Sequence, residues 1–222
     1  MSVVLVVGTD TGVGKTWVSR VLAHSVRAAG RRVVAIKPVE TGCVDPAGAW
    51  EDGALLAAAT GQASPRTALR RLVTPVAPAV ACEAEGVTIE FDELVLEIES
   101  HASAAEIALV EGAGGLLSPI TWRWNALNLG KALGARVLLV AADHLGTINH
   151  TMLTLVALKL AEVEVCGVVL SAPVTPDRST GTNASAIARL SGLDRVVALP
   201  RAADPLLSAD CMAPVVEWVL PA

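Results

Sequence analysis

The sequence has no tyrosine, a single phenylalanine and only four cysteines, and each shortage excludes a class of function. Proteins that bind single-stranded nucleic acid stack bases on aromatic side chains, which are scarce here. Zinc sites and disulfide frameworks need closely spaced cysteines, whereas Cys43, Cys82, Cys166 and Cys211 are scattered and form no CxxC pair. We therefore expect the four cysteines to be small core residues.

The sequence also lacks a large net charge and long hydrophobic runs. The formal net charge is −5 and no stretch is strongly basic, so nucleic acid is a poor candidate partner. Although 53% of the residues are hydrophobic, no apolar run approaches the roughly 20 residues of a membrane-spanning helix. The N-terminus enters an apolar strand without the pattern of a signal peptide. These observations predict a cytoplasmic protein without a membrane partner, folded as a single α/β domain over residues 1–222.

The first motif that is present follows the apolar run at residues 3–7. It reads GTDTGVGKT from Gly8 to Thr16 and leads into an amphipathic segment. A strand, a glycine-containing loop and a helix form the context in which backbone N–H groups bind phosphate. Lys15 would reach the outer phosphates, and the Thr16 hydroxyl would ligate Mg²⁺. The general phosphate-loop pattern has glycine where this chain has Thr9, so this loop is one residue longer between its glycines.

Two further strand ends carry charged residues. The segment RRVVAIKPVETG predicts a buried strand that ends at Pro38, which places Lys37 at its carboxyl end. The segment IALVEGAGG predicts a second buried strand that ends in Glu111. An acid at that position coordinates Mg²⁺ in nucleoside triphosphatases. Because open parallel sheets bind ligands outside the carboxyl ends of their strands, Lys37 and Glu111 should face the phosphate loop.

Other segments supply weaker signals. Asp52 lies in the first turn of a short predicted helix, where an acid is usually a plain partner of the helix dipole. Residues 73–86 contain prolines that argue against a regular helix, so an ordered loop that could form a wall of the site is predicted. Residues 91–101 predict a surface helix. Residues 136–162 predict a strand, a turn and a helix whose opening, from Gly146 through Thr147 and Ile148 to Asn149, offers free amides to an anion.

The rest of the chain continues the same alternation. A strand is predicted in residues 164–176, a helix near 183–190 and a strand at 195–199. Apolar strands that alternate with helices predict a three-layer, P-loop NTPase-like α/β fold, with a mostly parallel central sheet and helices on both faces. The four histidines have no metal-ligand spacing, and we expect them to be structural or solvated: His24, His101, His144 and His150.

With these segments placed, the chain resembles the dethiobiotin synthetases, ATP-dependent enzymes that close the ureido ring in biotin synthesis. The matching motifs run in family order over nearly the whole chain: GTDTGVGKT, KPVETG, Asp52 at a helix start, PVAPAVACEAEG, VEGAGGLLSP and LGTINHTMLT. The longer phosphate loop is itself part of this pattern. The resemblance implies that diaminopelargonic acid takes up CO₂ as a carbamate, whose oxygen attacks the γ-phosphate of ATP. Ring closure by the second amine then expels phosphate.

The resemblance also implies roles for individual residues. Lys37, Lys15 and Thr11 would be catalytic, and Mg²⁺ would be held by Thr16, Asp52 and Glu111. Thr41 would contact the diamine, and its distant carboxylate would bind at Gly146, Thr147, Ile148 and Asn149 of a neighbouring subunit, which implies a homodimer. The residues implied to contact the nucleotide are Gly12, Val13, Gly14, Lys15, Thr16, Trp17, Asp52, Glu111, Gly112, Ala113, Gly114, Pro200, Arg201 and Ala202.

Two other classes of protein share the phosphate loop. A partitioning or metal-insertion ATPase of related fold would be a switch, and it is the main alternative. Such proteins typically carry an additional lysine early in the loop, which Thr9 to Thr11 lack. An amidotransferase-type ligase would need a glutaminase domain with a nucleophilic cysteine, and the residues after Pro176 are too few for one.

Base recognition is where the chain departs from the family pattern. Many members have Asn-Asp before VTP, whereas this chain has Ala172 and Pro173. Neither side chain can hydrogen-bond a base edge, and proline also lacks the backbone N–H. We predict that ATP, CTP and GTP all support synthesis. Rates with each nucleotide at equal diamine, bicarbonate and Mg²⁺ would measure this. A preference for ATP on the order of a hundredfold in kcat/KM, about 2.7 kcal/mol, would contradict it.

Overall fold

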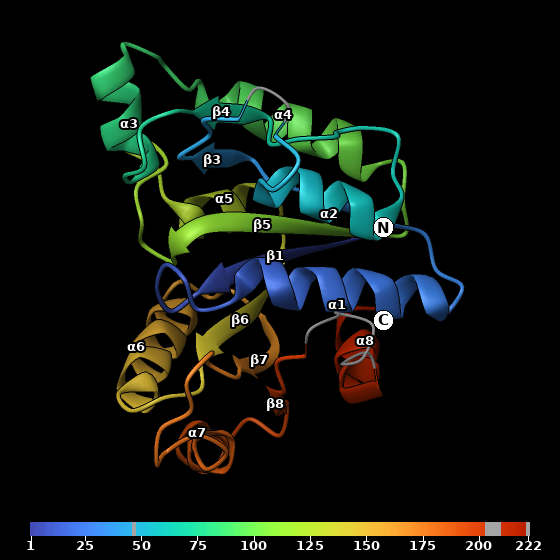
Figure 1. The fold of residues 1–222 in the computed structure, drawn as a ribbon, viewed down its shortest axis with the longest axis vertical. Coiled ribbons are helices and arrows are strands. Elements are labelled where there is room, and N and C mark those ends of the chain that lie inside the picture. Colours follow the sequence, from blue (N-terminus) through green and yellow to red (C-terminus); the bar gives the residue numbers. More distant parts are fainter. Residues whose placement is uncertain (46–47, 203–209, 221–222) are drawn as a thin grey trace.

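The computed structural model describes residues 1–45, 48–202 and 210–220. Within them, six strands form one parallel sheet in the order β2-β5-β1-β6-β7-β8 (Figure 1). Their bounds are β1 (Ser2–Gly8), β2 (Val33–Ile36), β5 (Ile107–Gly115), β6 (Arg136–Ala142), β7 (Val165–Ser171) and β8 (Val196–Leu199). Strands covered on both faces are expected to be mostly apolar, as these runs are, and Glu111 within β5 is the buried acidic exception. The predicted parallel α/β fold is confirmed.

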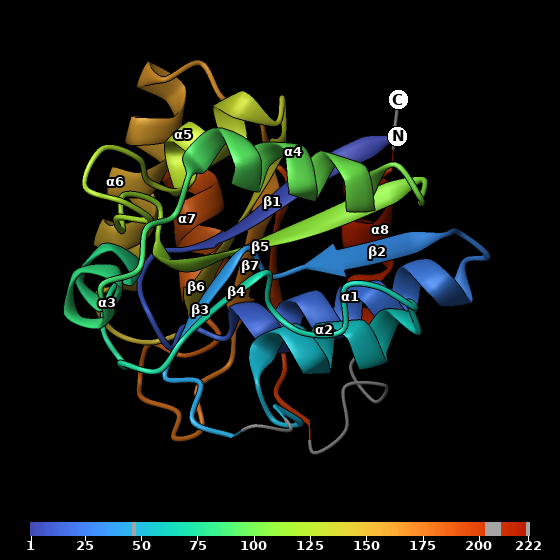
Figure 2. The same ribbon diagram turned by 90° about the horizontal axis from the view of Figure 1, so that it is seen from above.

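Helices cover both faces of the sheet, and two groups of buried side chains lie beneath them. One face carries α1 (Lys15–Ala28), α2 (Asp52–Thr60) and α8 (Ala213–Val219). The other carries α4 (Phe91–Ala102), α5 (Ala126–Ala132), α6 (Thr147–Leu160) and α7 (Asn183–Ser191). Figure 2 shows α1 and α2 on the opposite side of the sheet from α4 and α5.

The strand order brings the functional motifs to one edge. β1 lies between β5 and β6, so the loop after β1 stands where the chain turns from one half of the sheet to the other. Ligands of doubly wound sheets bind at such a point. The parallel register pairs Val6 of β1 with Glu111 of β5. Glu111 therefore lies beside the strand that leads into the phosphate loop.

The structure corrects the predicted end of one strand and shows two short strands that were not predicted. The sequence predicts that one strand ends in Glu111, but β5 continues to Gly115 because Gly115 still pairs with Gly8 of β1. No strand was predicted for the run that follows Pro38. It forms β3 (Val39–Thr41), which pairs in parallel with the unpredicted β4 (Arg70–Leu72) as a separate two-stranded sheet.

The prediction of an irregular segment over residues 73–86 is wrong in its second half, where α3 spans Pro78–Glu85. Pro78 occupies the first helical turn, where its missing N–H breaks no intrahelical hydrogen bond and its fixed φ suits the helix. The helices α5 and α8 were also not predicted. A capping box between Asn125 and Asn128 begins α5. Both asparagines are also common in turns, so this start is weakly marked in the sequence.

The cysteine prediction holds for three of the four residues. All four are free thiols, but Cys211 is exposed rather than part of the core. Among the described residues, no helix is both long enough and apolar enough to cross a membrane.

Candidate active site

The phosphate loop joins β1 to α1 through two glycines with positive φ. Gly12 has φ of 74° and Gly14, the N-cap of α1, has φ of 96°, values that favour glycine. A Cβ at Gly14 would also lie 2.5 Å from Ser171 Oγ. Within the described structure no side chain caps α1. Its first N–H groups are therefore left for a ligand, as the phosphate-binding interpretation requires.

Lys37, Asp52 and Glu111 form a buried ion-pair network beside this loop. Lys37 directly follows β2 and is only 4% exposed. Its Nζ donates to Asp52 Oδ2 at 2.7 Å and to Glu111 Oε1 at 2.8 Å. Asp52 begins α2, and Glu111 is fully buried in β5. The fold thus brings together three charged residues that were selected separately from the ends of strands and helices.

Two hydroxyl groups from α1 complete the surroundings of Glu111. Thr16 Oγ1 donates to Glu111 Oε1 at 2.8 Å, and Ser19 Oγ donates to Glu111 Oε2 at 2.7 Å. Ser19 was not predicted. It follows Thr16 by three residues and so lies on the same helix face, a spacing that could have indicated it. Both carboxylate oxygens are therefore held in place by donors.

The two lysines of the site differ in their protonation. Burial lowers the pKa of Lys15 to about 8, and the positive charge of Lys37 adds to this effect. Burial alone would also lower the pKa of Lys37, but the Glu111 and Asp52 carboxylates outweigh it and raise this pKa above its usual value. Burial would raise the pKa of Asp52, yet Lys37 lowers it on balance. Lys37 is thus a permanent ammonium ion, whereas Lys15, whose Nζ donates to Asp10 O at 3.0 Å, loses charge near pH 8.

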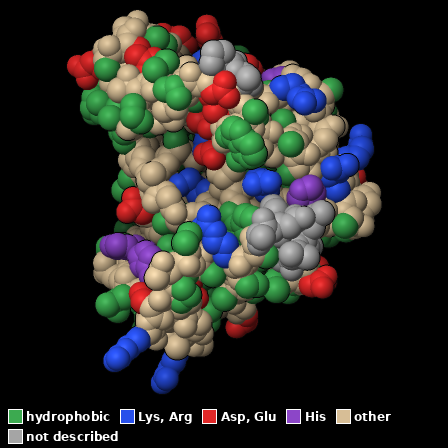
Figure 3. Space-filling view, viewed as in Figure 1, with side chains coloured by type: hydrophobic (Ala, Val, Ile, Leu, Met, Phe, Trp, Pro, Cys, Tyr) green, Lys and Arg blue, Asp and Glu red, His purple; other side chains and the backbone are tan. Residues whose placement is uncertain are grey.

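A cavity of about 360 Å³, here called the phosphate cavity, lies over the loop and contains most of the predicted site. Figure 3 shows Lys and Arg side chains gathered around the hollow in the middle of the molecule, with acidic side chains above it. Glu111 does not line this cavity but contacts Lys37, which does. The lining residues are Thr11, Gly12, Gly14, Lys15, Thr16, Trp17, Lys37, Val39, Glu40, Thr41, Asp52, Ala113, Gly114 and Arg201.

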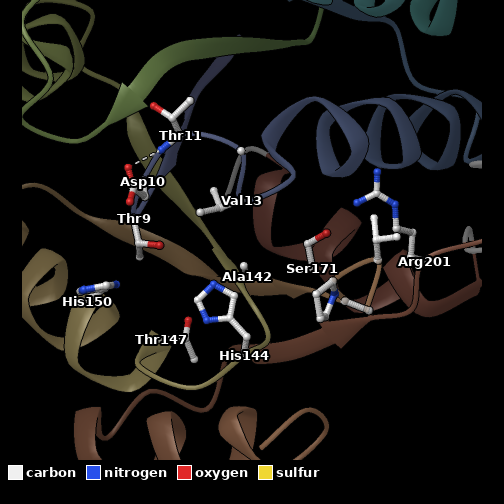
Figure 4. A pocket seen from close by; sticks show the side chains of 14 residues that line it. Thr9, Asp10, Thr11, Val13, Ala142, His144, Thr147, His150, Ser171 and Arg201 are labelled. Atoms are coloured by element: carbon white, nitrogen blue, oxygen red, sulfur yellow. Dashed lines mark hydrogen bonds between the residues drawn. The ribbon is translucent and has the colours of Figure 1, made fainter. Parts of the chain in front are cut away.

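A second cavity of about 240 Å³, here called the base cavity, lies on the other side of the phosphate loop. Thr11, Gly12 and Arg201 line both cavities. Figure 4 shows His144, Thr147 and His150 at one end of it and Ser171 and Arg201 at the other. Ala172 and Pro173 also line it, so the two residues that replace the family's Asn-Asp face this space.

Some predicted residues do not reach either cavity. Gly146 is the N-cap of α6 and has φ of 94°. Of the four residues from Gly146 to Asn149, all of which the structure describes, only Thr147 lines the base cavity. Ile148 and Asn149 line neither cavity, and the same holds for Pro200 and Ala202.

The other predicted nucleotide contacts are placed as follows. Val13 is buried and lines the base cavity. Trp17 lines the phosphate cavity and packs against the core beneath α1. Gly112 lies within β5 next to Glu111.

The oxygen donors suit Mg²⁺. Thr16 offers a hydroxyl, and Asp52 and Glu111 offer carboxylates, the hard ligands that Mg²⁺ prefers. Thr16 already contacts Glu111, and Lys37 links Glu111 to Asp52. The three candidate metal ligands therefore lie in one small region beside the phosphate loop, which fits a cation bound together with phosphate.

The chain is similar to known proteins in family, in sequence and in structure. A family model described as an AAA domain matches residues 2–205. The chain is 41% identical over 198 residues to the ATP-dependent dethiobiotin synthetase BioD of Anaeromyxobacter dehalogenans, covering 88% of each chain. It is 37% identical over 216 residues to the enzyme of the same name from Aquifex aeolicus, covering 97% of this chain and 96% of that one.

Solved structures share the fold at low sequence identity. The cell division ATPase MinD of Pyrococcus furiosus aligns with a TM-score of 0.61 at 18% identity, over 99% of this chain and 98% of that one. The septum site-determining protein MinD of Pyrococcus horikoshii, complexed with Mg-ADP, aligns with a TM-score of 0.56 at 18% identity, over 99% of this chain and 86% of that one. These similarities support the P-loop fold.

The unequal surroundings of the two lysines predict unequal reactivity toward cyanate, which modifies neutral amines. At pH 8 about half of Lys15 is neutral, because its pKa is about 8. Lys37 stays protonated, so we expect it to react more than about tenfold more slowly than Lys15. The chain has only four lysines, and the exposed Lys131 and Lys159 are internal references in peptide mass spectrometry. Asp52→Asn should accelerate modification of Lys37. Equal rates for Lys15 and Lys37 would contradict the assignment.

Proposed function

The chain belongs to the family of ATP-dependent dethiobiotin synthetases, and on that premise we propose how its residues carry out the reaction. It is an ATP-dependent ligase of biotin biosynthesis, and the close relatives do not favour the alternative of an ATPase switch. The observation that carries the proposal is the buried Lys37 ammonium, which lines the phosphate cavity together with Lys15. The reaction would occur in the cytoplasm, and activity found only in a membrane or periplasmic fraction would contradict that location.

In the proposed reaction, diaminopelargonic acid bears a carbamate formed from CO₂, and a carbamate oxygen attacks the γ-phosphate of ATP. The protein needs no covalent intermediate, because the reaction mainly requires alignment and neutralisation of charge. Lys37 neutralises the oxygens of the carbamate and of the transferred phosphoryl group, since its two carboxylate partners keep it protonated. Lys15 and the first N–H groups of α1 bind the phosphates, whose charge favours the protonated form of Lys15.

The part of the phosphate cavity lined by Thr41 and Thr11 is proposed to receive the diamine. Thr41 ends β3 and lines the phosphate cavity beside Lys37 and Asp52. Thr11 lies close to Gly114, since a Cβ added there would be 3.5 Å from Thr11 Oγ1. These residues surround a space between the phosphate loop and the end of β5. An amine held in this space would be next to the γ-phosphate position.

Mg²⁺ is proposed to be held by Thr16, Asp52 and Glu111. When bound, it would neutralise phosphate oxygens and favour departure of the leaving group. The nucleotide base is proposed to enter the base cavity between Ala172, Pro173 and Arg201, which connects the two cavities.

The test of this function is formation of dethiobiotin from diaminopelargonic acid, bicarbonate, ATP and Mg²⁺, detected by mass spectrometry. Lys37→Gln should lower kcat by at least roughly 10²-fold, the typical loss for one preorganised electrostatic group, with nucleotide binding largely preserved. Lys15→Gln should reduce both synthesis and nucleotide binding. Lys131→Gln, at an exposed lysine, is the matched control. Absence of dethiobiotin from the wild-type reaction, or a Lys37→Gln variant with most of its kcat, would refute the proposal.

An exposed apolar face along the middle and end of α6 supports a homodimer. Leu155 and Leu158 of α6 pack into the core, whereas Leu153, Val156 and Leu160 are 61%, 50% and 81% exposed. The three exposed residues lie on one face of the helix by their spacing. A large exposed apolar surface usually marks a protein interface. We propose that two copies pack through this face, so that Gly146 to Asn149 of one copy meets the diamine of the other.

Introducing a charge at Leu153, the residue of this face that is nearest in sequence to the α6 opening, should separate the copies. We expect the wild type to sediment as a dimer and Leu153→Glu as a monomer that binds nucleotide but forms little dethiobiotin. The matched control is Leu190→Glu, which alters a 61% exposed leucine on α7 and should remain dimeric and active. A wild-type monomer with full activity would exclude the shared site.

A further inference from the structure

Glu40 is a buried carboxylate in the wall of the phosphate cavity that the proposed reaction does not use. It is the middle residue of β3 and is 8% exposed. Its Oε1 accepts a hydrogen bond from Asp52 N–H at 2.5 Å, and its Oε2 accepts one from Gly53 N–H at 2.9 Å. Asp52 and Gly53 are the first two residues of α2. A side chain from a separate strand therefore caps the helix that carries Asp52.

The residue that would normally cap α2 is engaged elsewhere. Glu51 occupies the N-cap position but makes no capping hydrogen bond. Both of its carboxylate oxygens accept hydrogen bonds from Arg71. Glu40 satisfies two of the free N–H groups instead, and its negative charge lies at the positive end of the helix dipole. The start of α2 is thus tied to β3, three residues along the chain from Lys37.

The start of α2 also has little room to shift. A Cβ added at Gly53 would lie 2.2 Å from the backbone nitrogen of Ala68. The backbone of residues 67–68 therefore packs closely against the first turn of α2, and Glu40 accepts hydrogen bonds from the N–H groups of that turn. The Asp52 peptide is fixed from both directions, and its carboxylate points to Lys37.

We propose that Glu40 is a positioning residue, which holds the backbone of Asp52 so that the Asp52 carboxylate stays directed at Lys37 and at the proposed Mg²⁺ site. This inference rests on the proposed function of Asp52. Each carboxylate oxygen of Glu40 accepts a backbone N–H from the start of α2, so this side chain is directed at the helix that carries Asp52.

The test uses Glu40→Gln, which preserves size but replaces one acceptor oxygen by a donor group facing a backbone N–H. Binding of a fluorescent ATP analogue is titrated with Mg²⁺. We expect the Mg²⁺ concentration at half-maximal enhancement to rise by roughly tenfold, as for loss of one charged hydrogen bond, while affinity measured without Mg²⁺ is unchanged. An unchanged Mg²⁺ requirement in a folded Glu40→Gln protein would overturn the proposal.

Glu51→Gln is the matched control, because it makes the same chemical change next to Asp52 but affects only the pair with Arg71. Its Mg²⁺ requirement should match that of the wild type. Asp52→Asn should weaken Mg²⁺ binding by itself, and adding Glu40→Gln to it should have no further effect on Mg²⁺. If Glu40→Gln does not fold, Glu40→Asp is used, because it keeps the charge but is too short to reach both N–H groups.

The outcomes separate this proposal from the proposed function. If Asp52→Asn raises the Mg²⁺ requirement and the folded Glu40 variants do not, Asp52 keeps its role and the positioning role is refuted. If Asp52→Asn has no effect on Mg²⁺, the metal assignment and the positioning role both fail. Failure to form dethiobiotin would instead refute the reaction, whatever the Mg²⁺ titrations show.

Discussion

The contact of one buried ammonium with two carboxylates is the interaction on which the rest of the site depends. Lys37 joins the end of β2 to the start of α2 and to the interior of β5, and Thr16 and Ser19 add α1 to the same network. Removing one partner of such a buried group leaves an uncompensated charge, which typically costs about 3–5 kcal/mol. The network therefore constrains four elements to a single arrangement around the phosphate loop.

Such a charged network is expensive to bury, so its retention in the wall of a phosphate cavity indicates a functional role. In the proposed reaction a triphosphate would add negative charge next to Lys15 and Lys37, and a divalent cation would compensate the carboxylates. The negative charge of the ligand would thus lie beside the lysines, and the positive charge of the cation would lie beside the carboxylates. Two lysines with different pKa values allow one to bind phosphate reversibly while the other remains a fixed charge.

The two cavities divide the proposed reaction between the halves of the sheet. The phosphate cavity draws on residues after β1, β2 and β3 and within β5, whereas the base cavity draws on residues after β6 and β7. The phosphate loop separates them because β1 is central. Ala172 and Pro173 line the base cavity and not the phosphate cavity, so they lie apart from the charged network around Lys37. The exposed face of α6 lies outside both cavities, consistent with a role between copies.

The sequence by itself determined the parallel α/β fold and selected most residues of the candidate site. Apolar strands, a glycine loop and polar residues at strand ends are local patterns with local physical causes, and they identified Lys15, Thr16, Lys37 and Glu111. The position of Asp52 was weak evidence for a site, because an acid at a helix start usually only stabilises the helix dipole. Only the tertiary structure showed that Lys37 bridges Asp52 and Glu111.

The tertiary structure alone also identified Ser19 and Glu40, whose partners lie 92 and 12 or 13 positions away in the chain. No local sequence pattern indicates that a carboxylate on a strand will cap a helix elsewhere in the chain. Likewise, α3 was missed because a proline's effect depends on its position within the turn. The sequence determines which groups are available at each element's end. Their pairing depends on strand order and register, which arise from packing of the whole chain.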